Sequence, residues 1–140
     1  MSFLLDTNLV SELRKGDRAH PAVVAWFSGL AEGEIFLSVL TIGEIRHGIE
    51  SIRRRDPDSA AILDGWLHRL LAQHADRIVP IDRTIAEQWG RLGVPDPLPV
   101  VDGLLAATAL VHGLTLATRN VKHVQRTGAS CVNPFAPAIR

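Results

Sequence analysis

Only one cysteine, Cys131, occurs in the 140 residues of the chain, so no disulfide bond can form within it. A disulfide framework is therefore excluded as a source of stability, and a single thiol is compatible with a reducing cytoplasm. The longest strongly apolar run of the C-terminal half, residues 104–111, is much shorter than the ~20 residues of a membrane-spanning helix. The N-terminus lacks a basic segment and Asp6 interrupts its apolar stretch, which argues against a signal peptide. These absences predict a cytoplasmic protein that does not associate with membranes.

A net charge is also absent, because 15 lysine and arginine residues balance 15 aspartate and glutamate residues. A neutral chain is not a general binder of polyanions, so any contact with nucleic acid must come from local basic clusters. Two such clusters are present, residues 53–55 and the group of Arg119, Lys122, His123 and Arg126. Both are also compatible with the ordinary solvent-exposed surface of a helix end and of a loop.

Several sequence motifs of enzymes are missing. The chain contains neither the GxGxxG pattern of dinucleotide-binding proteins nor the GxxxxGK[ST] pattern of a phosphate-binding P-loop. Its six histidines do not follow the HExxH or Cys/His spacing of zinc sites, and the Cys131 thiol has no evident activating partner. The sequence therefore disfavours dinucleotide, P-loop, zinc and thiol chemistry.

The elements that are present predict an α/β fold. The length is typical of one domain, which we expect to span residues 1–140 and to bury a core without a metal or a disulfide. Short apolar or β-branched runs predict four strands, at Phe3–Leu5, Ile35–Ser38, Ile78–Ile81 and Thr115–Thr118. Between them apolar residues recur at helical spacing, as in Ile42, Ile45, Ile49 and Ile52. Strands that alternate with helices predict a three-layer α/β domain with a mainly parallel sheet.

Some helix boundaries are marked by their residues. Asp56 can cap a helix that begins at Pro57, and Asp82 can cap the helix after the third strand. The segment 101–113 is apolar on nearly every side, which predicts a buried helix that ends at Gly113.

Polar residues gather where parallel strands end, which is the edge at which ligands bind in open α/β sheets. Asp6, Asp82 and Asn120 each follow a predicted strand, and Glu44 and Asp102 belong to the helical segments. Carboxylates that are distant in sequence repel one another if they converge without a compensating cation. Oxygen ligands of this kind suit Mg²⁺, which can polarise a phosphoryl oxygen and activate water. The pattern therefore indicates a divalent-cation site that acts on a phosphodiester.

Each of these residues also has a purely structural interpretation. Asp6 is a common helix N-cap residue, and Asn120 could occupy a turn. Glu44 completes the pattern Thr41-Ile-Gly-Glu, which is typical of a capping box in which the glutamate bonds back to the backbone of the threonine. Asp102 could cap or begin the apolar helix beside it. Taken singly, the residues leave both interpretations open.

The order of the motifs along the chain is more informative than any one of them. The segments "LLDTNLVSEL", "LSVLTIGEIRHGIE", "VDGLLAATALVHGLTLATRN" and "TGASCVNPF" occur in this order over nearly the whole sequence. In this the chain resembles the PIN-domain family, and within it the VapC-type toxin ribonucleases of bacterial toxin–antitoxin pairs, especially their FitB-like branch. The resemblance implies a three-layer α/β/α PIN-like domain with a mainly parallel central sheet of four to five strands.

The resemblance also assigns the active-site residues. By motif, Asp6, Glu44 and Asp102 match the three acidic residues that bind Mg²⁺ or Mn²⁺. Family members carry a further acid either at the position of Asn120 or three residues later, where this chain has His123. We take Asn120 as the fourth active-site residue, with His123 as the alternative for that position. The loss of one carboxylate is expected to weaken binding of the metal.

The implied activity is metal-dependent hydrolysis of RNA by an endoribonuclease. Arg119, Lys122 and Arg126 are candidates for contacts with RNA phosphates, and Thr7 and Thr118 for hydrogen bonds that support the site. The implied partners are a cognate VapB-type antitoxin and a second copy of the chain in a homodimer. The alternative function is a PIN-like module that binds RNA or protein with little catalysis, because the fourth acid is missing.

Overall fold

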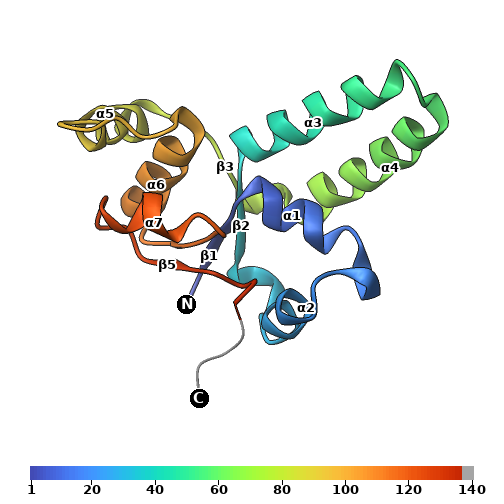
Figure 1. Ribbon diagram of the computed structural model, residues 1–140, viewed down its shortest axis with the longest axis horizontal. Coiled ribbons are helices and arrows are strands. Elements are labelled where there is room, and N and C mark those ends of the chain that lie inside the picture. Colours follow the sequence, from blue (N-terminus) through green and yellow to red (C-terminus); the bar gives the residue numbers. More distant parts are fainter. Residues whose placement is uncertain (137–140) are drawn as a thin grey trace.

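A parallel sheet lies between two groups of helices in the computed structural model, which describes residues 1–136 (Figure 1). The strands are β1 (Phe3–Leu5), β2 (Ile35–Ser38), β3 (Ile78–Val79), β4 (Thr115–Ala117) and β5 (Cys131–Val132). Their order in the sheet is β3-β2-β1-β4-β5, and every neighbouring pair is parallel. The predicted α/β/α architecture with a parallel sheet of four to five strands is confirmed.

The ends of two strands differ slightly from the prediction. Strand β3 ends at Val79, before the predicted Ile81, because Pro80 has no backbone N–H and cannot continue the ladder. Strand β4 ends at Ala117, although the Thr118 backbone N–H still donates to the Val132 carbonyl at 2.9 Å. Strand β5 is the additional, edge strand of the sheet.

The helices form the two outer layers of the fold (Figure 1). One layer contains α1 (Thr7–Leu13), α2 (Pro21–Ser28), α3 (Val39–Arg53) and α4 (Pro57–Gln73), and the other contains α5 (Arg83–Leu92), α6 (Val100–His112) and α7 (Val121–Gln125). Short 3-10 turns occupy Gly16–Arg18, Glu32–Glu34 and Ala75–Arg77. None of the helices in residues 1–136 has the length and apolar character needed to cross a membrane.

The central strand β1 is buried on both faces. Leu5 packs against the layer of α1 to α4, whereas its neighbour Leu4 packs against α6 and α7. Successive side chains of a strand point to opposite faces, so a continuous apolar run is what a strand between two layers requires. Helix α6 is buried along most of its length, as predicted, and its small residues Ala106 and Ala109 pack in the same core as Leu4.

The predicted helix caps are present. The Asp56 side chain accepts a hydrogen bond from the Ser59 backbone at 3.2 Å, and Pro57 is the first residue of α4. Helix α6 ends at His112 with Gly113 as its C-cap, as predicted, and the Gly113 φ of 65° lies in the left-handed region that favours glycine.

The positive φ of Gly113, compared with the helical backbone of Gly48, generates a prediction about stability. We expect Gly113→Ala to lower the free energy of unfolding by about 1–2 kcal/mol, because a Cβ is strained at positive φ. Gly48 lies on the exposed side of α3 and has nothing within 4 Å of an added Cβ, so Gly48→Ala is expected to raise the free energy of unfolding by about 0.5–1 kcal/mol. Urea denaturation followed by circular dichroism measures both values. Equal effects of the two variants would contradict the assigned end of α6.

Candidate active site

The candidate site lies at the carboxyl end of the two central strands, β1 and β4. The chain leaves β1 toward β2 on one side, while β4 pairs with β1 on the other side. This is the topological switch point at which open α/β sheets bind their ligands. Asp6 follows β1 directly and donates its backbone N–H to the Ala117 carbonyl at 3.1 Å, so it lies where the two strands diverge.

The Asp6 side chain is held by two donors. It is only 6% exposed. Its Oδ1 accepts a hydrogen bond from the Leu9 backbone at 2.9 Å, and its Oδ2 accepts one from Thr118 Oγ1 at 2.6 Å. Asp6 is therefore the N-cap of α1, as its structural interpretation proposed, and at the same time a buried carboxylate fixed from β4. The two interpretations of this residue are compatible.

The electrostatic surroundings of Asp6 disfavour its charged form. Burial raises the pKa of Asp6 above its ordinary value, which the hydrogen bonds from Thr118 and Leu9 partly oppose by lowering it. The negative charges of Asp102 and Glu44 raise the same pKa further. The carboxylates at positions 6, 44 and 102 thus interact electrostatically at one end of the sheet.

Glu44 does not form a capping box, which was its structural interpretation. Helix α3 begins at Val39, and the Ser38 side chain caps it by accepting a hydrogen bond from the Leu40 backbone at 3.1 Å. Thr41 therefore lies inside the helix rather than at its cap, and the Glu44 side chain is not needed to bond back to the backbone. The Glu44 carboxylate instead accepts a hydrogen bond from Thr7 Oγ1, which connects α3 to the start of α1.

Asp102 lies in the first turn of its helix and does not cap it. Helix α6 starts at Val100 after Pro99, and Asp102 lies in its first turn, where a negative charge is favoured by the helix dipole. Its Oδ2 lies 3.2 Å from His123 Nδ1, and its side chain is 24% exposed. Asp82, by contrast, is a helix cap that accepts from the Ile85 backbone at 3.0 Å, and it is not among the charges that shift the pKa of Asp6.

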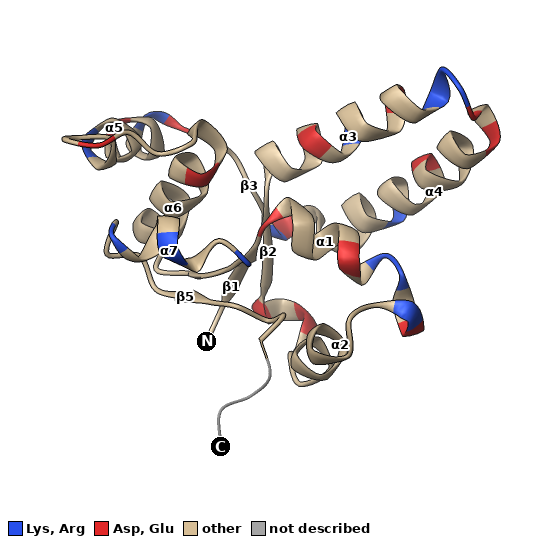
Figure 2. Cartoon of the chain, viewed as in Figure 1, with Lys and Arg blue, Asp and Glu red and all other residues tan. Residues whose placement is uncertain are grey.

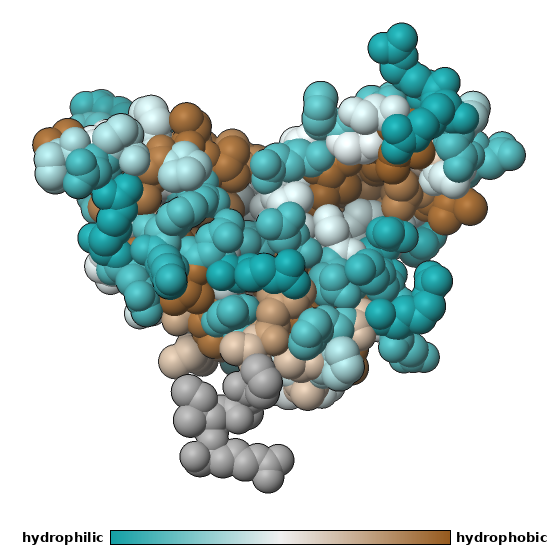
Figure 3. Space-filling model, in the orientation of Figure 1, coloured by the Kyte–Doolittle hydropathy of each residue, from teal (hydrophilic) through white to brown (hydrophobic). Residues whose placement is uncertain are grey.

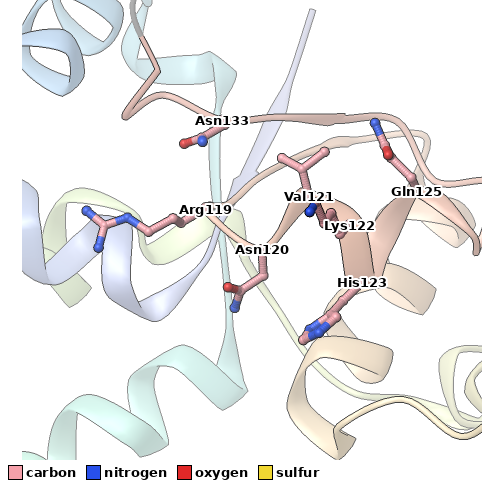
Figure 4. Close-up of a pocket in the computed structure, with 7 residues that line it drawn as sticks. All are labelled: Arg119, Asn120, Val121, Lys122, His123, Gln125 and Asn133. Carbon is pink, nitrogen blue, oxygen red and sulfur yellow. The ribbon is translucent and has the colours of Figure 1, made fainter.

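Asn120 and His123 lie beside the acidic residues on the segment after β4. The Asn120 backbone donates to Thr118 Oγ1 at 3.0 Å, so Thr118 connects it to Asp6, while the Asn120 side chain makes no capping bond to α7. In the close-up the Asn120 amide and the His123 ring extend in the same direction from α7 and its preceding loop (Figure 4). They line a shallow pocket of about 530 Å³ together with Arg119, Val121, Lys122, Gln125 and Asn133.

Two arms of the molecule flank this end of the sheet. Acidic residues occur near the starts of α1, α3 and α6, and a basic residue occurs on α7 (Figure 2). In the space-filling view a notch separates the arm of α5 and α6 from the arm of α3 and α4 (Figure 3). Asp102 on α6 and Glu44 on α3 therefore come from opposite sides of the notch, with Asp6 directly after β1 between them.

The donor set fits a hydrated hard cation better than a closed metal cage. Within residues 1–136 no group of three or more His, Cys, Asp or Glu side chains converges closely enough to hold a metal ion directly. Mg²⁺ typically keeps several waters and uses only one or two carboxylates of the protein. The charges of Asp102 and Glu44 raise the pKa of Asp6 although the three carboxylates do not converge on one point, and this arrangement suits water-mediated binding.

The three basic candidates have different environments. The Arg119 guanidinium stacks on the Phe135 ring at 3.7 Å, and His20 packs edge-on against the same ring with centroids 5.7 Å apart. Arg126 donates to the Pro97 carbonyl at 3.1 Å, so it is engaged by the loop before α6, whereas Lys122 lines the pocket. Sequence analysis did not anticipate the role of Phe135, although it lies in the closing "TGASCVNPF" segment.

The fold and this arrangement of acidic residues define a PIN domain, and comparison with known proteins establishes the class: residues 3–128 match the PIN domain family, so the chain belongs to that family. Within it the chain belongs to the VapC/FitB-type branch. It is 30% identical to "VapC ribonuclease Y4jK" of Sinorhizobium fredii over 96% of this chain and 99% of that protein. It is 31% identical to "Toxin FitB" of Neisseria gonorrhoeae over 94% of this chain and 97% of that protein.

Solved structures agree with this assignment. The structure of FitAB bound to an IR36 DNA fragment superposes with a TM-score of 0.88 at 27% identity, covering 98% of both chains. FitAcB from Neisseria gonorrhoeae superposes with a TM-score of 0.86 at 29% identity, covering 95% of this chain and 98% of that chain.

The raised pKa of Asp6 generates a prediction about pH. A carboxyl whose pKa is raised by folding binds its proton more tightly in the folded than in the unfolded protein, so its charged form lowers stability above the raised pKa. This loss of stability disappears as the pH falls below the ordinary value of 3.8. In metal-free protein we therefore expect Asp6→Asn to raise the Tm at neutral pH, with a gain that shrinks on acidification.

Thermal unfolding followed by circular dichroism in EDTA measures this difference. Asp82→Asn is the matched control, because asparagine also caps helices well and position 82 is exposed. A lower Tm of Asp6→Asn at neutral pH would contradict the dominance of burial over the two hydrogen bonds.

Proposed function

We propose that the protein is the toxin of a type II toxin–antitoxin pair and acts as an endoribonuclease with a bound Mg²⁺ or Mn²⁺ ion. The observation that carries the proposal is the buried carboxylate of Asp6, whose pKa is raised by burial and further by Asp102 and Glu44. A cation would relieve this unfavourable charge. The names of the relatives, a VapC ribonuclease and a FitB toxin, support the same function.

In the proposed mechanism Asp6, Asp102 and Glu44 hold the cation directly or through waters. When bound, the cation supplies an activated water for attack on the phosphodiester and stabilises negative charge on the phosphoryl oxygens. The residues of the chain hold the metal-binding carboxylates in place before the reaction. Thr118 and the Leu9 N–H fix Asp6, and Thr7 orients Glu44, so these groups need not reorganise during the reaction.

Asn120 is proposed to complete the site through its amide, which makes no bond to α7 and extends beside His123 (Figure 4). Arg119 and Lys122 are proposed to bind the phosphates on either side of the cleaved bond. Stacking on Phe135 occupies one face of the Arg119 guanidinium and leaves its N–H edges available for a phosphate. Arg126, which we include among the RNA-contact candidates, is engaged by Pro97 and has less freedom to move.

The proposed partner is a VapB-type antitoxin that covers the acidic site, and the proposed assembly includes a homodimer of this chain in the cytoplasm. We further propose that residues 1–140 form a single PIN domain. Similarity to the chain of FitAB supports the antitoxin partner.

A second candidate is a PIN-like binding module with little catalysis. Two observations favour it: neither position 120 nor position 123 carries an acid, and the described part of the chain contains no three-ligand metal cluster. Titration of Mn²⁺ and Mg²⁺ with RNA present separates the two functions, because the module would bind RNA without forming metal-dependent products.

The enzymatic proposal predicts the effect of removing single carboxylates. We expect Asp6→Asn and Asp102→Asn each to lower metal-dependent cleavage of a sensitive RNA by at least about 100-fold, because each removes a charge that holds the cation. The measurement is product formation on a gel with purified protein. Asp82→Asn removes an exposed carboxylate outside the site and should retain full activity; undiminished cleavage by both site variants would refute the assignment.

The phosphate contacts predict a change in salt dependence. We expect Arg119→Ala and Lys122→Ala each to weaken binding of single-stranded RNA to catalytically inactive Asp6→Asn protein. Each should also reduce the slope of log Kd against log salt by about 0.7, as for one lost phosphate contact. Fluorescence anisotropy at several salt concentrations measures the slope. Arg83→Ala is the control, since that side chain is 92% exposed on α5 and pairs with Glu87.

A further inference from the structure

His123 contacts one of the candidate metal-binding carboxylates from another helix. Its Nδ1 lies 3.2 Å from Asp102 Oδ2, while its own side chain is 54% exposed. Asp102 comes from α6 and His123 from α7, separated by 21 residues. We propose that His123 is a positioning residue that holds the Asp102 carboxylate in the orientation used for the divalent cation. This inference rests on the proposed function and adds a residue to the same site.

Each of the three acidic side chains has a donor supplied by another part of the fold. Thr118 at the end of β4 donates to Asp6, and Thr7 on α1 donates to Glu44. Among the residues that the structure describes, His123 is the only side chain that forms a hydrogen bond with the Asp102 carboxylate. Without it, the partly exposed Asp102 side chain would be free to adopt other rotamers, and orienting it would cost conformational entropy.

A second contact fixes α7 relative to the start of α6. Arg126, directly after α7, donates to the carbonyl of Pro97, two residues before the N-cap Pro99. Val124 anchors α7 in the core beside α6, where it is 2% exposed. The segment that carries His123 thus makes two polar contacts with the segment that carries Asp102, through His123 itself and through Arg126, and one apolar contact through Val124. Such an attachment gives the His123 ring a defined position although the ring faces solvent.

The chemistry of the contact between His123 and Asp102 defines which ring nitrogen positions the carboxylate. An ionised carboxylate only accepts hydrogen bonds, so Nδ1 must carry the proton and donate to Asp102. A nitrogen that donates in this way has no lone pair for a cation. Nδ1 is therefore not a ligand in this contact, and the proposed role of His123 is exerted through Asp102. The side-chain amide of asparagine can place a donor near the position of Nδ1, whereas that of glutamine reaches the position of Nε2.

The test is the affinity of the purified full-length chain for Mn²⁺ alone, measured by isothermal titration calorimetry without RNA. We expect His123→Ala to raise the Kd about 10-fold, as is typical for loss of a hydrogen bond to a ligating carboxylate. His123→Asn should restore the Kd to within about 3-fold of the original, and His123→Gln should resemble His123→Ala. His112→Ala, at the exposed far end of α6, is the matched control and should leave the Kd unchanged.

The outcomes separate this inference from the proposed function. An unchanged Kd of His123→Ala, while Asp6→Asn loses Mn²⁺ binding, overturns the role of His123 and leaves the proposed function intact. If His123→Asn binds as weakly as His123→Ala, then positioning through Nδ1 is wrong. If Asp6→Asn binds Mn²⁺ as well as the original chain, the proposed function itself fails. The Tm of every variant is measured in parallel, so that a loss of affinity from unfolding is recognised.

Discussion

Burial of the Asp6 carboxylate is the constraint on which the organisation of the site depends. A carboxylate at the end of the central strand cannot be solvated by bulk water, so its charge must be compensated by the protein or by a ligand. The Leu9 N–H and the Thr118 hydroxyl provide part of this compensation, yet burial still raises the pKa of Asp6. The nearby negative charges of Asp102 and Glu44 act in the same direction. The fold thus maintains a site with an excess of negative charge.

The sheet topology explains why acidic residues that are distant in sequence share this site. All strands are parallel, so their carboxyl ends and the helices that start there lie on one side of the molecule. Asp6 caps α1 and Asp102 occupies the first turn of α6, where the partial positive charge of a helix start favours a carboxylate. These local interactions let the protein tolerate like charges in the absence of a cation. They stabilise each acid separately, without relieving the repulsion between them.

Much of the fold could be predicted from the sequence because it depends on local patterns. The continuous apolar run of β1 reflects burial on both faces of the strand. The repeated isoleucines of α3 reflect burial on one face of the helix. Of the two interpretations of Glu44, the capping box fails for a local reason as well: Ser38 caps α3 three residues before Thr41, and its side chain accepts the backbone N–H of Leu40. A pattern of residue types identifies possible caps, but competition between neighbouring candidates decides which is used.

The contacts that refine the site could not be predicted in the same way. The stack of Arg119 on Phe135 and the bond from His123 to Asp102 join segments whose relative placement depends on how α7, which connects β4 to β5, packs against α6 and β5. No spacing rule connects residues 102 and 123. From the sequence alone, His123 could equally be a metal ligand or have another role in the site.

The distribution of basic residues limits how a neutral chain of this kind can engage RNA. Arg46 and Arg53 pair with Asp64 across the hairpin of α3 and α4, and Arg126 is engaged by Pro97. Arg119 and Lys122, by contrast, line the pocket beside the acidic site. Under the proposed function, Arg119 and Lys122 would therefore supply the phosphate contacts nearest the cleaved bond. Under the proposed function, selection among RNAs would therefore depend on the shape of the RNA in the notch between α3 and α6 more than on charge.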